Sequence, residues 1–476
     1  MSMPQQSAAS AGALQDIAPA APAISWGGEL KALFLLGWPL IVAQLAQNAL
    51  FTTDIIMMGW LGPKYLAAGA LAMAFFICLQ LFGVGLVGAV APMVAQALGA
   101  RDFRSVRRTV RQGFWVAIVL VVLLFPIVWS VRPIFLFLGQ NPELTVLAEQ
   151  FLHYAVWLLF PALGIIVLRS FLSAHGATAV ILLITVAGVV VNGLANYALM
   201  FGNWGFPRLE LRGSGIATTL VNLVMFGLML AYVLTHRRFR RYHILARFFK
   251  PDWPRFLEIF RIGGPIGFLL LAEVGLFTAA AFLMGWLGPD EVAGHTIALQ
   301  CASLAFMVPL GLSQATTVRV GIAYGQRWPD GISKAGWASL VVTLGFMSLT
   351  CLTFVLLPQT LVGLFLDRTN PANLNTLALA ASYLGVAALF QLVDGTQVAA
   401  AAALRGLSDT KMPLVIALVG YWAIGMPIAY VLGFVFGMRG VGIWLGLAAG
   451  LAFVAVVLII RFAMRERLGL LRSAPV

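Results

Sequence analysis

Long apolar segments recur along almost the whole chain and limit its fold more than any other feature. A helix that crosses a bilayer needs roughly 20 apolar residues. Twelve such segments begin near residues 32, 66, 112, 148, 177, 213, 260, 292, 336, 376, 412 and 440. A mean hydropathy of +0.96 and a charged fraction of 10% exclude a soluble globular domain of 476 residues. The sequence therefore predicts an all-α polytopic membrane protein with 12 transmembrane helices.

A repeat divides these segments into two halves. With a shift of 226 residues, positions 58–63 match positions 284–289 residue for residue, and Gly37 falls on Gly263. Later, Leu168-Arg169 is echoed by Leu404-Arg405, and residues 213–216 by residues 440–443. Six helices per half is an even number, so both halves enter the membrane in the same direction. We expect two six-helix lobes, related by an axis along the membrane normal, around a central cleft.

The distribution of basic residues predicts the orientation. Arginines crowd the loops near residues 101–111 and 237–261, whereas the alternate loops hold only Lys64, Arg132, Arg208, Arg212, Arg368 and Arg439. Positive loops remain in the cytoplasm, which places both termini there. We expect the protein in the cell membrane, that is, the inner or plasma membrane. The net charge of +13 thus reflects topology, and no nucleic-acid partner is expected.

The same pattern divides the chain. We predict a disordered cytoplasmic tail over residues 1–28, which has no basic residue before an apolar core and so is not a signal peptide. An N-lobe over 29–235, a basic linker over 236–258, a C-lobe over 259–464 and a tail over 465–476 follow. The linker arginines serve as a topological anchor or also contact anionic membrane lipids.

Three acids fall well inside apolar segments: Asp54, Glu273 and Asp394. A carboxyl at membrane depth must face a wet cavity, bind a cation or carry a proton. Each is therefore a candidate site for a coupling ion, and Asp54 is the best of them.

Asp54 has polar residues on its own helix and on the fifth segment. Gln47 lies two turns earlier on the same face, and Gln44 and Asn48 extend this strip as candidate cavity-lining residues. Asn192 and Asn196 are four residues apart and share a face. They either join helices by hydrogen bonds or, as we favour, orient Asp54 and its proton.

The C-half has a different set of charges, because the repeat places Glu273 on Gln47 and Asp54 on Ala280. Glu273 and Asp394 form one acidic site if the seventh and tenth helices face each other; otherwise they are two separately protonated acids. Gln391 and Gln397 are the polar neighbours of Asp394 and further cavity candidates.

The remaining sequence motifs give weaker evidence about function. Pro39 and Pro265 occupy equivalent positions and are either hinges or static kinks. The GxGxxG match at residues 83–88 lies inside an apolar helix and indicates helix packing. Walker A and HExxH motifs are absent, and the cysteines have no metal-ligand spacing. We expect neither an enzyme nor a cofactor, and no metal beyond Na⁺ at the acidic sites.

Several stretches together resemble the multidrug and toxic compound extrusion (MATE) family, in its NorM-like branch. The resemblance covers all twelve helices in order. It is carried by residues 53–59 (TDIIMMG), Asn192 with Asn196, and residues 272–274, 294–300, 308–312, 318–321, 393–397 and 403–406.

The resemblance implies a secondary-active antiporter that exports organic, often cationic, compounds in exchange for H⁺ or Na⁺ and acts as a monomer. It further implies an N-lobe ion site at Asp54, Asn192 and Asn196 and a C-lobe site at Glu273 and Asp394. Phe390 departs from several NorM-like members, which have Tyr there, and the lost oxygen favours a proton at the C-lobe.

Three other functions remain open. A flippase of lipid-linked saccharides is the main alternative, but it requires a cationic cleft. A passive channel or a receptor-like protein would show conductance or binding without coupled transport. A cleft with three acids and many aromatic side chains favours aromatic cations.

Overall fold

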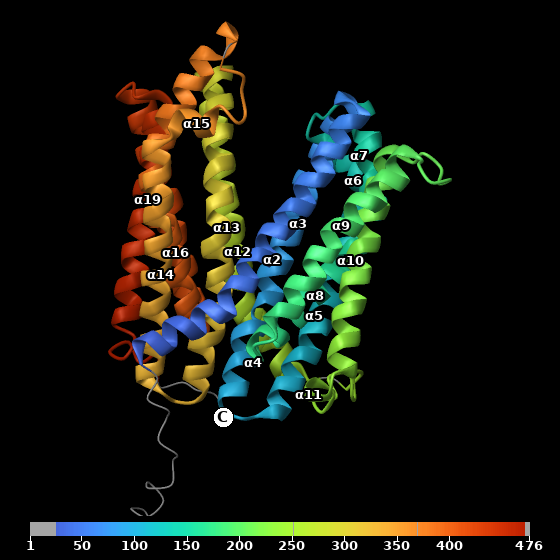
Figure 1. Cartoon of the computed structure of the whole chain (residues 1–476), viewed down its shortest axis with the longest axis vertical. Coiled ribbons are helices and arrows are strands. Elements are labelled where there is room, and N and C mark those ends of the chain that lie inside the picture. Colours follow the sequence, from blue (N-terminus) through green and yellow to red (C-terminus); the bar gives the residue numbers. More distant parts are fainter. Residues whose placement is uncertain (1–24, 251, 369, 472–476) are drawn as a thin grey trace, which may run out of the picture.

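The computed structural model describes residues 25–250, 252–368 and 370–471. Within them, 12 helical spans are long and apolar enough to cross a membrane, which confirms the predicted all-α fold. Figure 1 shows that these spans form two bundles. The N-terminal bundle contains α2 (Trp26–Leu61), α3 with α4 (Pro63–Gly88, Val90–Gly99), α5 (Phe103–Trp129), α7 with α8 (Pro142–Ala155, Leu159–Ala174), α9 (Thr178–Phe201) and α10 (Glu210–Thr235).

The C-terminal bundle repeats this order after the short helix α11 (Arg237–Arg240). Its spans are α12 (Trp253–Leu287), α13 (Pro289–Gly325), α14 (Pro329–Leu356), α16 (Leu374–Gly406), a span over Lys411–Val435 that contains α17 (Lys411–Leu418) and α18 (Met426–Tyr430), and α19 (Arg439–Ala463). Short helices α6 (Val131–Phe137) and α15 (Pro358–Val362) lie at the upper end of the bundles in Figure 1. The predicted tails fall largely on residues 1–24 and 472–476, which lie outside the described residues.

Most helices begin earlier than their apolar stretches. The third span begins at Phe103, whereas its apolar run begins near residue 112. The Asp102 carboxylate caps this helix by accepting hydrogen bonds from the backbone N–H groups of Arg104 and Ser105, at 3.1 and 3.0 Å. A capped, charged first turn can therefore continue the helix beyond the hydrocarbon, where hydropathy gives no signal.

The duplicated sequence at residues 58–63 and 284–289 is a helix end and turn. Gly62 and Gly288 adopt φ values of 127° and 143°, a region that favours glycine. Pro63 and Pro289 then begin α3 and α13, because proline fits the first turn of a helix. The repeat thus preserves a scaffold element that the two halves share.

The two halves meet through glycines at positions related by the repeat. A Cβ added at Gly263 of α12 would come within 2.0 Å of the Leu86 carbonyl oxygen in α3, and one at Gly37 of α2 would meet the Leu312 side chain of α13 at 3.0 Å. The same symmetry relates the close approaches of Gly85 with Gly267, Gly311 with Ile41, Gly99 with Ile322, and Gly325 with Gln96. Each half therefore packs its first helix against the other half.

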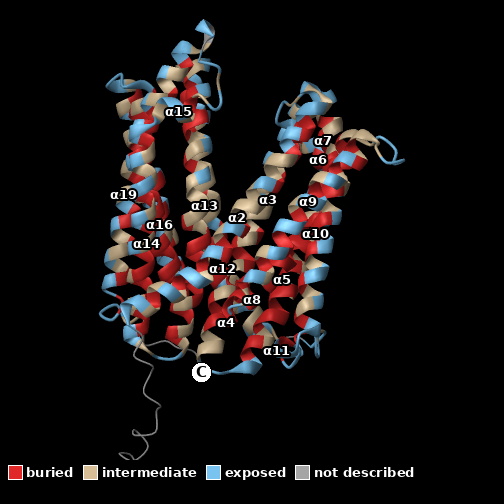
Figure 2. Ribbon diagram, in the orientation of Figure 1, coloured by how far each residue is buried: buried red, intermediate tan, exposed pale blue. Residues whose placement is uncertain are grey.

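The bundles join at one end only. In Figure 1 they meet at the lower end, where α2 and α12 begin and α19 ends, and diverge toward the upper end. Figure 2 shows buried residues concentrated in the lower and inner parts of the bundles. Many apolar side chains remain exposed, as at Leu183 (70%) and Phe282 (69%), which suits a protein surrounded by lipid.

Candidate functional site

Asp54 lies inside the N-terminal bundle and is only 1% exposed. Its Oδ1 atom accepts hydrogen bonds from the side-chain amides of Asn192 and Asn196, at 2.7 and 2.5 Å. Its Oδ2 atom accepts a third hydrogen bond, from the Thr218 hydroxyl at 3.0 Å. The structure thus brings together the three residues predicted from the sequence and adds Thr218 from α10.

The local geometry follows from helix periodicity. Asn192 and Asn196 project from one face of α9, and that face packs against α2. Both amides donate to the same carboxylate oxygen. Their own Oδ1 atoms are buried and have no protein partner among the described residues. Two carboxylate oxygens, two amide oxygens and a hydroxyl therefore gather at one buried centre, a donor set that can hold a proton or a hard cation.

The rest of the predicted polar strip on α2 does not join this centre. Gln44 lies where the two halves meet, and its Oε1 atom is 3.5 Å from Arg169 of α8. The same Arg169 donates to Gln314 of α13 at 2.7 Å. Gln47 and Asn48 are half-buried on α2. Ten residues of helix separate Gln44 from Asp54 by roughly 15 Å, so Gln44 does not touch the carboxylate, and its role as a cavity-lining residue stays a prediction.

The acids of the C-terminal bundle approach each other. Glu273 of α12 and Asp394 of α16 interact electrostatically, and Asp394 is 5% exposed. The rings of Phe277 and Phe390, each one turn from an acid, lie 6.0 Å apart, which shows that α12 and α16 face each other here. The positive charge of Arg405, also on α16, attracts the Glu273 carboxylate. The two helices thus face each other at this depth, and the shared acidic site stays a prediction.

The two glutamines near Asp394 differ. The Gln397 amide donates to the hydroxyl of Tyr421, which the sequence did not single out. Gln391 is 1% exposed, and neither its amide nitrogen nor its amide oxygen has a protein partner among the described residues. Within the same residues, no group of three or more His, Cys, Asp or Glu side chains is arranged to hold a metal.

The two prolines lie beside the contacts between the halves. Pro39 is buried in α2 between Gly37 and Ile41, and Pro265 is half-buried in α12. Both helices continue through the proline without a break. Their role as hinges or fixed kinks stays a prediction.

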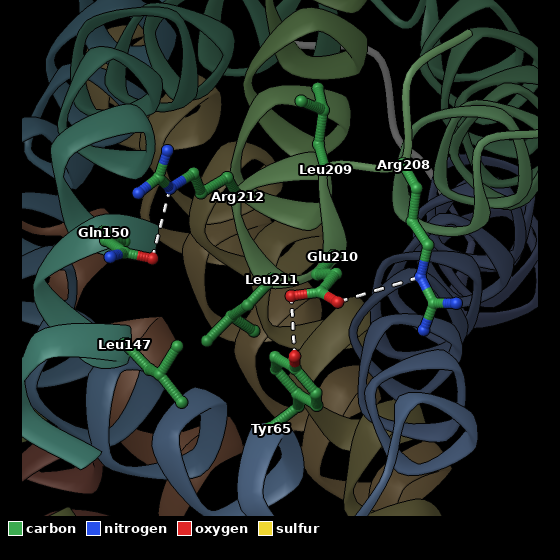
Figure 3. A pocket seen from close by; sticks show the side chains of 8 residues that line it. All are labelled: Tyr65, Leu147, Gln150, Arg208, Leu209, Glu210, Leu211 and Arg212. Atoms are coloured by element: carbon green, nitrogen blue, oxygen red, sulfur yellow. Dashed lines mark hydrogen bonds and ion pairs between the residues drawn. The ribbon is translucent and has the colours of Figure 1, made fainter. Parts of the chain in front are cut away.

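A surface pocket of about 200 Å³ opens at the upper end of the N-terminal bundle (Figure 3). The Tyr65 hydroxyl donates to Glu210 at 2.6 Å, and Arg212 donates to Gln150 at 3.1 Å. The repeat places Tyr65 on Glu291, which pairs with Arg439 at the start of α19. Each half thus joins its second and sixth spans by polar bonds at this rim, and none of the predicted site residues lines the pocket.

Comparisons with known proteins agree with one family. The model of the MatE family matches residues 39–198 and 265–431, together more than half of the chain. The chain is 49% identical over 440 residues to the probable multidrug resistance protein NorM of Brucella suis biovar 1 (strain 1330), covering 92% of this chain and 93% of that protein. It is 46% identical over 456 residues to the protein of the same name from Mesorhizobium japonicum, covering 95% and 98%.

Solved structures share the fold. A eukaryotic MATE transporter superimposes with a TM-score of 0.81 at 21% identity, covering 94% of this chain and 98% of that one. An outward-facing multidrug resistance MATE family transporter superimposes with a TM-score of 0.83 at 22% identity, covering 94% and 97%.

Proposed function

Because this chain belongs to the MatE family of multidrug and toxic compound extrusion transporters, we propose that it is a secondary-active antiporter that exports organic cations in exchange for H⁺ or Na⁺. The observation that carries this proposal is the Asp54 centre: a buried carboxylate held by three donors from two neighbouring helices. Such a centre can hold one cation within the membrane, and an ionisable residue at membrane depth is by default a candidate for function.

The hydrogen bonds at Asp54 suggest how the centre changes state. A carboxylate that accepts three hydrogen bonds is arranged as the ionised form. A protonated carboxyl needs an acceptor, and the unpartnered amide oxygens of Asn192 and Asn196 can provide one once an amide rotates. The same oxygens can bind Na⁺ in place of the proton. Loading of either cation therefore reverses hydrogen bonds between α2 and α9.

Loading of a cation at Asp54 can affect the cargo without direct contact between the cargo and Asp54. Since the side chain is 1% exposed, coupling must pass through the position of α2 rather than through direct contact. One part of α2 packs on α9, and another part packs on α13 and α14 of the other half. Neutralising Asp54 would change how α2 is held by one half and so shift the balance between two arrangements of the bundles.

The distribution of charged side chains supports a cationic cargo and the predicted orientation of the chain in the membrane. Asp54, Glu273 and Asp394 are acidic, whereas the half-buried Arg169 donates to Gln314 and the half-buried Arg405 interacts with Glu273. A flippase would need free cations for a diphosphate, so it is the weaker proposal. The arginine-rich lower end of Figure 1 is then cytoplasmic, and the diverging upper end opens outward. One chain carries both lobes, which suits a monomer in the inner membrane, with the coupling ion as its only cofactor.

The energetics allow such exchange. For a neutral compound, one ion crossing 100 mV yields about 2.3 kcal/mol, enough for roughly a fifty-fold concentration gradient at about 1.4 kcal/mol per decade. A monovalent cation exchanged one for one with H⁺ or Na⁺ moves no net charge, so its export is driven by the concentration gradient of the ion. The test is efflux of a fluorescent organic cation from proteoliposomes, driven separately by a proton gradient and by a Na⁺ gradient. Transport under one gradient alone identifies the ion. Equal leakage with and without either gradient would refute antiport.

A further inference from the structure

A file of polar side chains runs through the interior of the C-terminal bundle. Tyr383, His295, Trp444, Gln391 and Asp394 are each 5% exposed or less. In the part of the chain that the structure describes, each has a buried polar atom without a protein partner. These atoms are the Tyr383 hydroxyl, both ring nitrogens of His295, Nε1 of Trp444, both amide atoms of Gln391 and Oδ1 of Asp394.

The five side chains come from three helices that pack together. Tyr383, Gln391 and Asp394 are spaced by eight and three residues and so share one face of α16, over roughly 16 Å. The ring of His295 on α13 lies 5.5 Å from the ring of Trp444 on α19. Trp444 in turn lies 5.4 Å from Phe390, the residue before Gln391. The Tyr383 ring also lies 3.2 Å from the position of a Cβ added at Gly294, the residue before His295, so the five side chains occupy one region between α13, α16 and α19.

The upper end of this file lies just beneath the surface. The Tyr383 hydroxyl sits so close to Gly440 that an added Cβ there would approach it to 2.1 Å. Glu291, one turn above His295 on α13, pairs with Arg439, whose side chain is 61% exposed. The charges of Glu291 and Arg439 both interact electrostatically with the Tyr383 hydroxyl. The remaining acid at this rim, Asp290, accepts hydrogen bonds from Asn375 and Thr376.

The repeat shows that the fold does not require these polar groups. The matching positions of the N-terminal bundle are apolar throughout. Shifts of 226, 227 and 236 residues, taken from the matched segments, place His295 on Gly69, Trp444 on Ala217, Tyr383 on Leu147, Gln391 on Ala155 and Asp394 on Leu158.

Unpartnered polar atoms are expensive in such a place. Each buried polar group left without a hydrogen bond costs about 1–3 kcal/mol. Buried water commonly satisfies such groups, bonding to two to four polar partners. Five buried positions on three neighbouring helices with free donors and acceptors therefore point to water as their partner.

We propose that internal water molecules occupy this file and carry protons between the outer surface at Glu291 and the carboxylate of Asp394. As one O–H bond forms at Asp394, one O–H bond breaks at the adjacent water. That water then takes a proton from the next water toward Glu291, and so on, until the last water takes a proton from outside. The proton route rests on the proposed antiport, whereas the hydration of the file does not.

Hydration is tested first, by hydroxyl-radical footprinting of the purified protein in lipid nanodiscs. Radicals formed from bound water modify the side chains beside it. After correction for intrinsic reactivity, we expect Tyr383, His295 and Trp444 to be modified at least tenfold faster than Phe135 and Phe171, which are equally buried. Equal rates in the two groups would overturn the proposal, whatever the protein transports.

The proton route is tested in proteoliposomes with variants that replace a polar side chain by an apolar one of similar or smaller size. Tyr383→Phe, Trp444→Phe and Gln391→Met should each slow proton-driven efflux several-fold, and the triple variant at least tenfold, with unchanged substrate affinity. Tyr430→Phe, at a 49% exposed position of α18 outside the file, is the matched control. Wild-type rates in the triple variant would overturn the proton route. Normal efflux by Asp394→Asn would instead refute a coupling role for Asp394 and leave the footprinting result standing.

Discussion

The carboxylate of Glu29 accepts two hydrogen bonds from the guanidinium of Arg319, with an Nε–Oε1 distance of 2.8 Å. Glu29 lies on the first turn of α2, and Arg319 lies on α13 of the other half. The Glu29 side chain is 1% exposed and that of Arg319 is 23% exposed. This pair ties the two bundles together at the end where they meet.

Removing one partner of this pair should loosen that end. A buried charge left unpaired costs about 3–5 kcal/mol, and the lower figure suits Arg319 because it is partly exposed. About 3 kcal/mol corresponds to a change of more than a hundredfold in the balance between two arrangements. We expect Glu29→Gln to lengthen the distances between spin labels placed on the lower ends of α4 and α13, measured by pulsed electron resonance.

Two comparisons make this prediction specific. The exchange of both partners, Glu29→Arg with Arg319→Glu, should restore much of the wild-type distance distribution. Lys64→Gln removes a pair of the same length, 2.8 Å, whose side chains are 56% and 75% exposed, and it should change nothing. Identical distributions for Glu29→Gln and wild type would show that the pair does not hold the bundles closed.

Asp54→Asn should abolish ion-coupled efflux while the protein still inserts and folds. The amide keeps the shape of the side chain but cannot take up a proton. Thr218→Val removes one hydrogen bond to the carboxylate, worth about 1.5–3 kcal/mol when an acceptor is charged, and should slow efflux about tenfold without abolishing it. Both variants are measured in proteoliposomes beside the wild type. Coupled exchange by Asp54→Asn at the normal rate would remove this residue from the mechanism.

Residue type was enough to find most of the Asp54 centre. An acid and two asparagines are rare in apolar segments, and their spacing places both amides on one face of α9. Thr218 gave no such signal. A threonine hydroxyl in a helix can bond to the carbonyl four residues earlier, and Thr218 lies 2.9 Å from the Ser214 carbonyl. Threonine is therefore common in membrane helices for reasons unrelated to function.

Contacts between the halves could not be predicted in the same way. Glu29 and Arg319 are 290 residues apart, and neither position is unusual near a helix end. The proximity of Gln44 to Arg169 was likewise not predicted, because helix periodicity tells which face a residue lies on, not which bundle covers that face at a given depth. Where α2 leaves one half and packs on the other is a property of the assembled bundles.

His175, just beyond the end of α8, should make stability depend on pH. Its Nδ1 atom lies 2.8 Å from the Phe171 carbonyl, and its Nε2 atom lies 2.7 Å from the Tyr242 hydroxyl in the linker. The ring therefore donates through Nδ1 and accepts through Nε2, as the neutral form. Burial lowers the pKa of His175 from 6.5 to about 4, and the nearby charges of Arg238 and Arg241 act in the same direction.

Because the pKa of His175 is lower in the folded chain than in the unfolded chain, stability should decrease as the pH falls. Above pH 6.5 the ring is neutral in both the folded and the unfolded chain, and the full stability is present. As the pH falls toward 4, only the unfolded chain gains the proton, so stability is lost. Between pH 7.5 and pH 5 the loss should be about 2 kcal/mol. Thermal unfolding in detergent should show His175→Gln losing less stability than wild type over this interval, and parallel pH profiles would contradict the assignment.

Adjacent glycines on α12 provide the sharpest test of how closely the halves must approach. At Gly263 a Cβ would meet the Leu86 carbonyl oxygen at 2.0 Å, and main chain cannot move aside as a flexible side chain can. At Gly264 nothing lies within 4 Å. Gly264→Ala should therefore be neutral or stabilise the helix by up to about 1 kcal/mol. Gly263→Ala should push α12 away from α3, speed amide hydrogen exchange in both helices and lower efflux at least tenfold. Equal exchange and equal efflux in the two variants would show that this close approach is not required.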